Sequence, residues 1–579
     1  MTASPDDFNR TSPNEARSPG WRIRPYSVVA GALVFTILLL IVVPIGRMIA
    51  RAFTVDGHFD FSPAIETLQQ GWLPDVLFST LVVVIVSTLL SLVIGACLAW
   101  LNERTDANLG LAGAILPILP FLIPGVALAI GWALIGAPRV GFLNGILASM
   151  PLIGRDGLNF TVNIYSWTGL LWIYTLHGVP LIYLVVSAAL RNLDPSLEEA
   201  SLMNGAGLWR TLRKVSFPAI RPALLSASLL VAISGFALYS LPAIVATGAR
   251  IDMLSVHAVR LLRNTYPPRL DQAIVLGLMA LLFVGSLWCL QRYFASSGRF
   301  VSIGGRAAGE RRLSLGAWRI PARIVMVFYL LCASVIPLLA LIIVAFQPFW
   351  SPRIQTALLT LDNFKAILFA NRLTSEAFKN SLQLALVGAT LATAIALIVS
   401  IYTARNHTWF ARVADGLVKA PSTISALVIS IGFLVTFAGP PFYLGGTLII
   451  LLLAFIVIYL PSASIAIDSA VAQVGDDLWE ASQISGAGDG RTVRKIVVPL
   501  TLLGLAAGWA IVFVHIMGDL SASALLAGVG SPVIGYAMLE VWENGSYSLL
   551  AAFATLMCFA ITAVVACVIG LARRFSRFG

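Results

Sequence analysis

The sequence predicts an all-α polytopic membrane protein with about twelve transmembrane helices, arranged as two parallel six-helix repeats. Three observations predict this class. Of the 579 residues, 58% are hydrophobic and only 11% are charged, whereas about a quarter of the residues in a soluble domain are charged. The apolar residues gather in runs long enough to cross about 30 Å of hydrocarbon. A long polar motif also occurs twice in otherwise apolar surroundings.

The apolar runs divide the chain into two halves. The candidate spans of the first half are 27–50, 76–101, 111–136, 166–191, 223–248 and 272–294, and those of the second half are 321–346, 379–404, 413–438, 446–470, 503–528 and 548–572. We therefore expect one repeat over 25–294 and another over 321–579, joined by a cytoplasmic linker at 295–320 that is rich in Gly, Ser and Arg. Residues 1–24 lack apolar periodicity, which predicts a disordered cytosolic tail.

The duplicated motif reads LEEASLMNGAGLWRTLRKVSFP at 197–218 and LWEASQISGAGDGRTVRKIVVP at 478–499. The two copies share 12 of 22 positions at a constant offset of 281 residues. Before the first copy, Asp194-Pro195 provides a helix N-cap and a first-turn proline, and Asn204-Gly205 can turn the chain. Each copy is therefore predicted to form a helix, a tight turn and a second, basic helix.

The motif resembles the cytoplasmic coupling loop, or EAA loop, of binding-protein-dependent ABC importer permeases. The matching residues are Glu199, Ala200, Ser201, Gly205, Val215, Phe217 and Pro218 in the first copy, and Glu480, Ala481, Ser482, Gly486, Ile496, Val498 and Pro499 in the second. The resemblance implies that loops 191–222 and 471–502 couple the chain to a separate ATPase. It also implies that Glu199 and Glu480 anchor the helices there, while Gly205 and Gly486 allow the turns.

Apart from the tail, the chain also resembles the fused two-half permeases of the ferric-iron importer family. The supporting stretches are the two coupling loops, residues 163–183 and residues 264–273. Iron members usually carry Lys-Glu-Leu-Pro-Ala-Thr in the eleventh span, where this chain has Gly518-Asp519-Leu520-Ser521-Ala522-Ser523. The resemblance implies a type I importer whose pore is this chain, with two copies of an ABC ATPase, an extracytoplasmic substrate-binding protein and membrane lipid as partners, and no nucleic acid. Ferric iron is the expected substrate, with thiamine, phosphonate, sugar phosphate or polyamine as the alternatives.

Charge placement predicts the topology. Six spans separate the two coupling loops, so both loops lie on one side, and their basic residues favour the cytosol. The protein is therefore expected to be multi-pass in a bacterial cytoplasmic (inner) membrane, with both termini cytosolic. The outer loop 249–271 is an exception, because it carries Arg250, Arg260, Arg263 and Arg269. These arginines indicate either a docking site for the binding protein or an error in the topology.

The chain has no GxxxxGK[ST] phosphate-binding loop, so it is expected to be a transport subunit rather than an enzyme, with no cofactor of its own. ATP and magnesium would then be bound by the partner ATPase. The ionisable residues of the predicted spans are His177, His515 and Asp519, with Asp468 near a span end. This sparse set argues against a secondary carrier with two parallel repeats, which is the alternative class and would need coupling-ion residues.

The same few polar residues are candidates for the translocation path. His515 and Asp519 are four positions apart and would share one helix face, and Tyr239 occupies the matching span of the first half. They either line the path or satisfy one another inside the bundle. His177, next to Gly178 and Pro180, is expected to bond a carbonyl freed at a kink. The sequence leaves any metal ligands unknown.

Overall fold

The structure is a computed structural model that describes residues 25–55, 58–110, 113, 119–121, 123–150, 161–297, 313–352, 356–406 and 408–575. Within these residues it is almost wholly helical, and the predicted all-α membrane class is confirmed. A short antiparallel hairpin, β1 (Thr54–Val55) and β2 (His58–Phe59), follows the first helix. The predicted tail over 1–24 and the centre of the predicted linker lie outside the described residues. The boundaries predicted for the two repeats stay predictions.

The first half contains the elements up to residue 297. They are α1 (Pro25–Ala52), α2 (Ser62–Leu68), α3 (Leu73–Arg104), α5 (Gly125–Gly136), α6 (Phe142–Ser149), α7 (Trp167–Arg191), α8 (Pro195–Met203), α9 (Leu208–Thr211), η2 (Leu212–Ser216), α10 (Phe217–Ala219), α11 (Arg221–Ala237), α12 (Ser240–Ala249), α13 (Leu254–Arg263) and α14 (Leu270–Ser297).

The second half contains the elements from residue 313 onward. They are η3 (Gly316–Trp318), α15 (Arg319–Leu330), η4 (Leu331–Val335), α16 (Ile336–Ala345), η5 (Thr356–Leu358), α17 (Asp362–Lys365), η6 (Ala366–Ala370), α18 (Arg372–Arg405), α19 (Trp409–Lys419), η7 (Ala420–Thr423), α20 (Ala426–Phe437), α21 (Leu448–Val471), α22 (Asp476–Ile484), α23 (Asp489–Thr492), η8 (Val493–Val497), α24 (Val498–Met517), α25 (Ser521–Leu526), α26 (Ile534–Glu543) and α27 (Tyr547–Phe575).

The predicted count of twelve spans can be compared with the helices of the described residues. Among the described residues, 9 helices are long and apolar enough to cross a membrane, or up to 11 if each of two bent pairs counts as one span. The predicted span 413–438 is one of these pairs, in which the helices on either side of the break meet at 101°. The predicted span 111–136 lies partly outside the described residues, and its described helix, α5, has only 12 residues. The count of twelve is therefore not confirmed.

Two predicted spans, 223–248 and 503–528, are each broken into two helices. The first breaks between α11 and α12, where Leu238 takes an extended conformation. The second breaks between α24 and α25, where the Asp519 carboxylate accepts hydrogen bonds from the backbone N–H groups of Ala522 and Ser523. A side chain that caps these free N–H groups starts a new helix and ends the continuous span. The sequence is apolar on both sides of each break, so hydropathy alone predicted one continuous span in each case.

The two halves exchange their first helices. Helix α1 packs on α20 of the second half, and α16 packs on α5 of the first half. The contacts are equivalent, because Gly131 lies against Pro337 and Gly432 lies against Pro44. At each glycine a side chain would meet the proline of the opposite half, so a missing Cβ permits the close approach. The exchange fastens the two repeats together inside one hydrophobic core.

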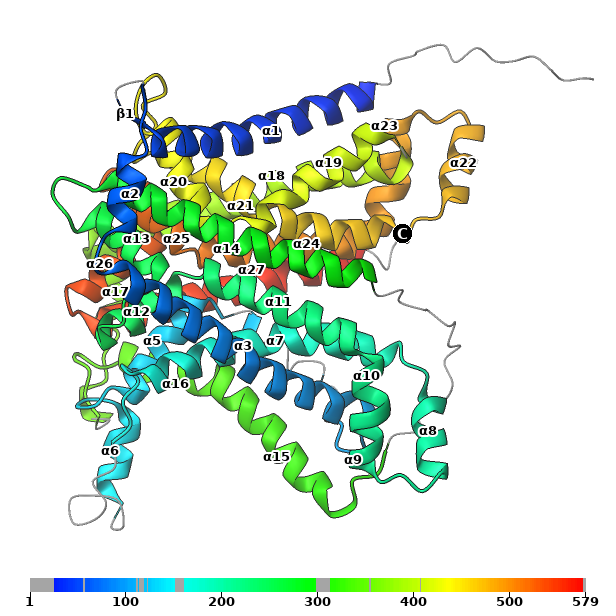
Figure 1. Cartoon of the computed structure of the whole chain (residues 1–579), viewed down its shortest axis with the longest axis horizontal. Helices are drawn as coiled ribbons and strands as arrows, with labels where there is room; N and C mark the ends of the chain where they lie inside the picture. Colours follow the sequence, from blue (N-terminus) through cyan, green and yellow to red (C-terminus); the bar gives the residue numbers. More distant parts are fainter. Residues whose placement is uncertain are drawn as a thin grey trace, which may run out of the picture.

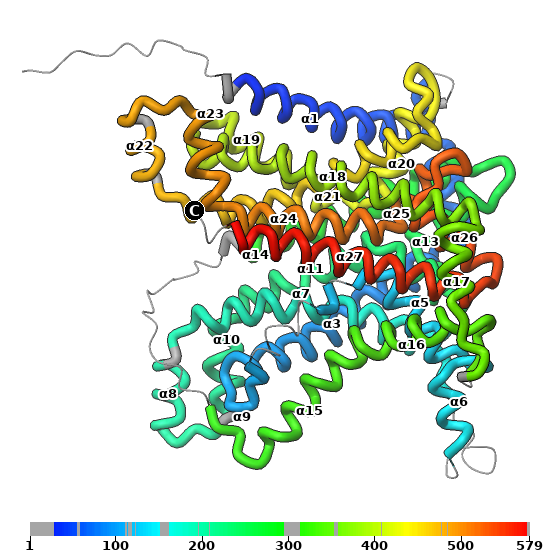
Figure 2. Tube along the Cα trace, turned by 180° about the vertical axis from the view of Figure 1, so that it is seen from behind, coloured from blue at the N-terminus to red at the C-terminus, as the bar shows by residue number. Residues whose placement is uncertain are grey.

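The two repeats are parallel in space. In Figures 1 and 2, α8 and α22 lie at the same end of the molecule, near the end of α27, whereas α13 and α26 lie at the opposite end. In both views the helices of the two halves diverge toward the α8 and α22 end. This arrangement agrees with the prediction that both duplicated motifs face one side.

Candidate functional site

The duplicated motifs form two hairpins that we call the first hairpin (195–218) and the second hairpin (476–499). Asp194 caps the start of α8, since its carboxylate accepts a hydrogen bond of 2.9 Å from the backbone N–H of Ser196. Both hairpins turn at a glycine in the left-handed region, Gly205 and Gly486, each with φ +77°. This conformation strains any residue with a Cβ and explains the duplicated glycine.

A second repeated feature holds the two arms of each hairpin together. The hydroxyls of Ser201 and Thr211 lie 2.9 Å apart in the first hairpin, and those of Ser482 and Thr492 lie 2.7 Å apart in the second. Both threonines are buried. All four residues belong to the positions shared by the two motifs, so this part of the sequence match encodes hairpin geometry.

The outer surface of each hairpin exposes apolar side chains. Met203 and its equivalent Ile484 are both 88% exposed, and Leu197 and Leu478 are 48% and 46% exposed. Exposed apolar residues at matching positions of two loops indicate a protein-binding surface. The same surface carries the predicted coupling residues Glu199, Ala200, Glu480 and Ala481, which are exposed.

The predicted prolines lie where each hairpin rejoins the bundle. Pro218 belongs to the first turn of α10, and Pro499 belongs to the first turn of α24. A proline is tolerated in the first helical turn because that turn has no intrahelical partner for its N–H. Both prolines follow a short π-helical turn, η2 or η8. Beyond the proline the halves differ, because α10 and α11 meet at a bend of 71° in the first half, whereas α24 continues unbroken in the second.

A buried ion pair joins the first hairpin to the bundle. The Nε of Arg104, at the end of α3, lies 3.7 Å from the Oε2 of Glu198 in α8, and the two side chains are 10% and 4% exposed. Ser216 donates a 2.5 Å hydrogen bond to Glu198 Oε1. Arg104 also donates to the carbonyls of Leu190 and Leu193, at 2.7 and 2.6 Å. We call this contact the first joint.

The second hairpin has an equivalent joint with different chemistry. The position of Glu198 is taken by Trp479, and that of Ser216 by Val497, both buried. The guanidinium carbon of Arg405, at the end of α18, lies 4.1 Å from the centre of the Trp479 ring, which is a cation–π contact. Sequence reasoning missed both joints. The available signal was the difference between Glu198 and Trp479 within the shared motif, together with an arginine at the end of the second long apolar stretch of each half, Arg104 and Arg405.

The central break contains a cluster of polar side chains. Tyr459 in α21 donates a 2.7 Å hydrogen bond to Asp519 Oδ2, and its ring stacks on that of His515 with centroids 5.3 Å apart. The prediction that His515 and Asp519 share one helix face is wrong, because α24 ends at Met517, between the two residues. Both instead contact Tyr459, which sequence reasoning did not identify. With both carboxylate oxygens accepting hydrogen bonds, Asp519 stabilises the break.

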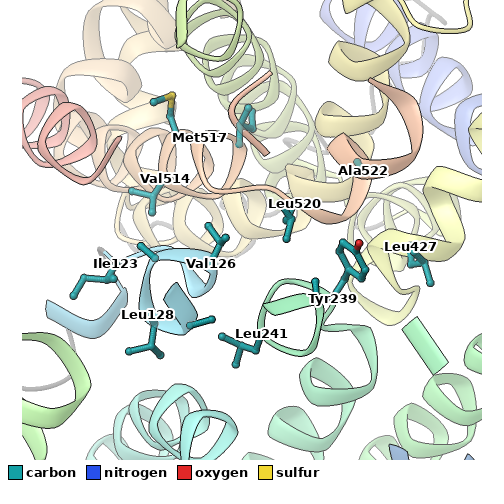
Figure 3. Packing of buried hydrophobic residues seen from close by; sticks show 14 of the residues in the cluster. Ile123, Val126, Leu128, Tyr239, Leu241, Leu427, Val514, Met517, Leu520 and Ala522 are labelled. Atoms are coloured by element: carbon teal, nitrogen blue, oxygen red, sulfur yellow. The ribbon is translucent and has the colours of Figure 1, made fainter. Parts of the chain in front are cut away.

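Residues of both halves pack around this break. Tyr239 directly precedes α12 and is 3% exposed. Figure 3 shows Val126 and Tyr239 of the first half in the same packed centre as Leu427 and Leu520 of the second. Each break also meets the start of a helix from the opposite half: Pro124 lies against Gly518, and Ser425 donates a 3.5 Å hydrogen bond to the carbonyl of Ala237. The path roles of Tyr239, His515 and Asp519 stay predictions.

His177 lies in the middle of α7, and its side chain is exposed although Leu176 and Gly178 beside it are buried. Its Cε1 atom and the Oγ of Ser240 both lie beside Gly125, at the start of α5. His177 is therefore close to the start of α12, whereas the sequence had favoured a local bond at a kink.

The four outer arginines do not form one exposed patch. Arg260 pairs with Asp252 at 2.7 Å, and Arg263 pairs with Glu540 of the second half at 2.6 Å. Arg250 and Arg269 are exposed. The predicted docking role stays a prediction, and the structure leaves only the last two side chains fully available for it.

No metal centre is evident in the part of the chain that the structure describes, where no three His, Cys, Asp or Glu side chains gather. Its five cysteines are all free thiols.

Comparison with known proteins identifies relatives of this arrangement. The family model described as "Binding-protein-dependent transport system inner membrane component" matches residues 158–297 and 394–578, one stretch in each half. The chain is 24% identical over 545 residues to the ferric transport system permease protein FbpB of Actinobacillus pleuropneumoniae, covering 93% of this chain and 77% of the relative. It is 24% identical over 518 residues to the Fe(3+)-transport system permease protein FbpB 2 of Haemophilus influenzae, covering 89% and 92%.

Among solved structures, the chain is similar to a bacterial ABC transporter involved in the import of the acidic polysaccharide alginate. One of its chains matches with 20% identity and a TM-score of 0.36, over 45% of this chain and 95% of that chain.

Proposed function

The chain belongs to the family of binding-protein-dependent transport system inner membrane components, and on this premise we propose that it imports ferric iron. It is the multi-pass permease of an ABC importer. Iron is the proposed substrate because two relatives with ferric or Fe(3+) transport in their names align with about nine-tenths of the chain.

The duplicated hairpins support a two-site contact with an ATPase. Each hairpin presents one exposed glutamate beside exposed apolar residues, at the same end of the molecule. Two equivalent surfaces fit two copies of one ATPase subunit, which would bind the ATP and magnesium. Glu199 and Glu480 are free to form charge-assisted hydrogen bonds with that partner. This duplicated surface is the observation that carries the proposed coupling to an ATPase.

The mechanism follows from the rigidity of the joints. When ATP closes the ATPase dimer, the docking grooves approach one another and carry α8 and α22 with them. Because each hairpin is fastened to the end of α3 or α18 through Arg104 or Arg405, the motion passes into the long helices and rocks one half against the other. The packed centre around Tyr239 and Leu520 then opens toward the outside, where a binding protein delivers substrate. In this proposal the hairpins face the cytosol, and both termini lie there as well.

The experiment uses the complex of the permease with its ATPase in vesicles, with the substrate-binding protein supplied on the outer side. Uptake of labelled ferric iron, thiamine and a phosphorylated sugar is compared in the wild type, Asp519→Asn and Tyr459→Phe. We expect iron uptake in the wild type and reduced uptake in both variants, since each weakens the hydrogen bonds that hold the break. Uptake of the phosphorylated sugar alone, with both variants unimpaired, would overturn the iron assignment.

A further inference from the structure

Helices α13 and α26 are equivalent in the two repeats but carry opposite charges. At a constant offset of 280 residues, Arg260 corresponds to Glu540 and Arg263 to Glu543. The basic helix belongs to the first half and the acidic helix to the second. Both lie at the end opposite the hairpins (Figures 1 and 2). Repeats that diverge to opposite charge can attract one another across the boundary between the halves.

One direct contact links the two helices. Arg263 Nη2 donates a 2.6 Å hydrogen bond to Glu540 Oε1, and the guanidinium carbon lies 5.3 Å from the centre of the Tyr536 ring. The two charged side chains are 18% and 31% exposed. The pair is therefore shielded in part from water, yet it remains reachable from the outer surface.

Each helix is fastened to its own half by the same hydrogen bond. The backbone N–H of Leu254, which starts α13, donates to the hydroxyl of Thr80 in α3 at 2.9 Å. The backbone N–H of Ile534, which starts α26, donates to the hydroxyl of Ser381 in α18 at 2.7 Å. Each helix must therefore move with its own half. The Arg263–Glu540 pair joins two bodies that rock against each other in the proposed mechanism.

We propose that Arg263 and Glu540 form the outer gate of the permease. The pair holds the outer ends of the halves together in the conformation of this structure, in which the hairpins are apart, and it separates once in every transport cycle. A partly exposed pair is suited to this role because its net stabilisation is modest, so that it opens without a large barrier. Ser255 of α13 donates a 3.0 Å hydrogen bond to the carbonyl of Leu238 at the break before α12, so the helix that carries Arg263 contacts the packed centre. This inference rests on the proposed transport function.

The test locks the gate chemically. In a background in which Cys97, Cys289, Cys332, Cys558 and Cys567 are replaced, Arg263→Cys and Glu540→Cys are combined in the permease–ATPase complex. A short bis-methanethiosulfonate linker is expected to join them without nucleotide, lower uptake at least tenfold and lose its effect on adding dithiothreitol. The linking yield should fall when the ATPase is trapped with vanadate. The matched control is Arg372→Cys with Glu376→Cys, a pair at 2.6 Å within α18, which should not affect uptake.

A charge exchange tests the same pair without a linker. Arg263→Glu and Glu540→Arg are each expected to impair uptake and raise unstimulated ATP hydrolysis, because the outer end no longer closes firmly. Combining them should restore at least half of the wild-type uptake. Normal turnover of the linked protein, or a double variant no better than either single one, would overturn the gate. A wild type that neither binds its ATPase nor carries any tested substrate would instead count against the proposed function.

Discussion

Arg104 in α3 and Glu198 in α8 form a buried ion pair, 3.7 Å from Nε to Oε2, at the point where the first hairpin meets the bundle. The repeat preserves the location of this joint but changes its chemistry, because Arg405 stacks on Trp479 at the equivalent place. The two halves thus make the same connection between hairpin and long helix with two different interactions. The hairpin can transmit force to a long helix only while that connection holds.

Breaking the first joint should uncouple the hairpin from the bundle. Removing one partner of a buried ion pair costs about 3–5 kcal/mol, so Arg104→Gln is expected to lower uptake by at least about tenfold while the protein still reaches the membrane. Uptake and ATP hydrolysis in reconstituted vesicles measure this uncoupling. The control is Arg191→Gln, which breaks the nearby pair with Glu103 at 2.9 Å but removes a side chain that is 65% exposed. Equal effects of the two variants would contradict a special role for the joint.

The chemistry of the second joint should also work in the first. The double variant Glu198→Trp with Ser216→Val copies the pair Trp479 and Val497 into the first half. It is expected to keep more uptake than Glu198→Ala with Ser216→Ala, since Arg104 can stack on the new ring. Initial uptake rates of the two double variants decide the matter, and a transplant no better than the alanine pair would show that the ion pair itself is required.

The turn glycines should tolerate asparagine better than valine. Gly205 and Gly486 have φ +77°, and no other atom lies within 4 Å of a Cβ built on either, so a substitution there acts through backbone strain alone. The left-handed conformation costs about 1–2 kcal/mol for most residues, and Asn adopts it more readily. Valine at both positions should reduce co-purification of the ATPase, and asparagine should leave it near the wild-type level. Equal binding by both variants would show that the turn geometry is unimportant.

The exposed apolar residues of the hairpins should contribute to ATPase binding. Met203→Asp with Ile484→Asp places charges on two side chains that are each 88% exposed, so folding should be unaffected. The amount of ATPase that co-purifies is expected to fall several-fold. The control is Phe59→Asp in β2, where the side chain is 86% exposed; β2 pairs with β1, which lies at the opposite end of the molecule (Figure 1). Undiminished binding in the hairpin variant would remove these residues from the docking surface.

The exchange of first helices should depend on Gly131. A Cβ at this position would lie 2.7 Å from both the Cβ and the carbonyl oxygen of Pro337, and such overpacking costs about 1–3 kcal/mol. Gly131→Ala is therefore expected to lower the midpoint of thermal unfolding in detergent. Gly285→Ala is the matched control, because no other atom lies within 4 Å of its Cβ position and alanine favours the helix by about 1 kcal/mol. A destabilisation of the same size in both would contradict the close contact.

Apolar runs and a duplicated motif were enough to predict the class, the two repeats and the hairpin turns. These features are local in sequence: a span needs a minimum length of apolar residues, and a left-handed turn needs a glycine. The Asp194 cap and the turn at Gly205 therefore lie where the sequence predicts them. Hydropathy did not predict the helix breaks at residues 238 and 519, because the sequence stays apolar where one helix stops and the next begins.

Contacts between distant residues were decided only by the tertiary structure. The sequence placed Arg263 in the outer loop 249–271, but it paired neither Arg263 with Glu540 nor Arg104 with Glu198. The partners are up to 277 residues apart, and which side chains meet depends on the exchange of first helices and on how the halves pack. Arg263, which the sequence predicted as a docking residue for a partner protein, is thus already bound to Glu540. The role of a charged side chain depends on whether folding brings an opposite charge next to it. The distance between the two charges is set by the packing of whole helices, which the sequence alone does not reveal.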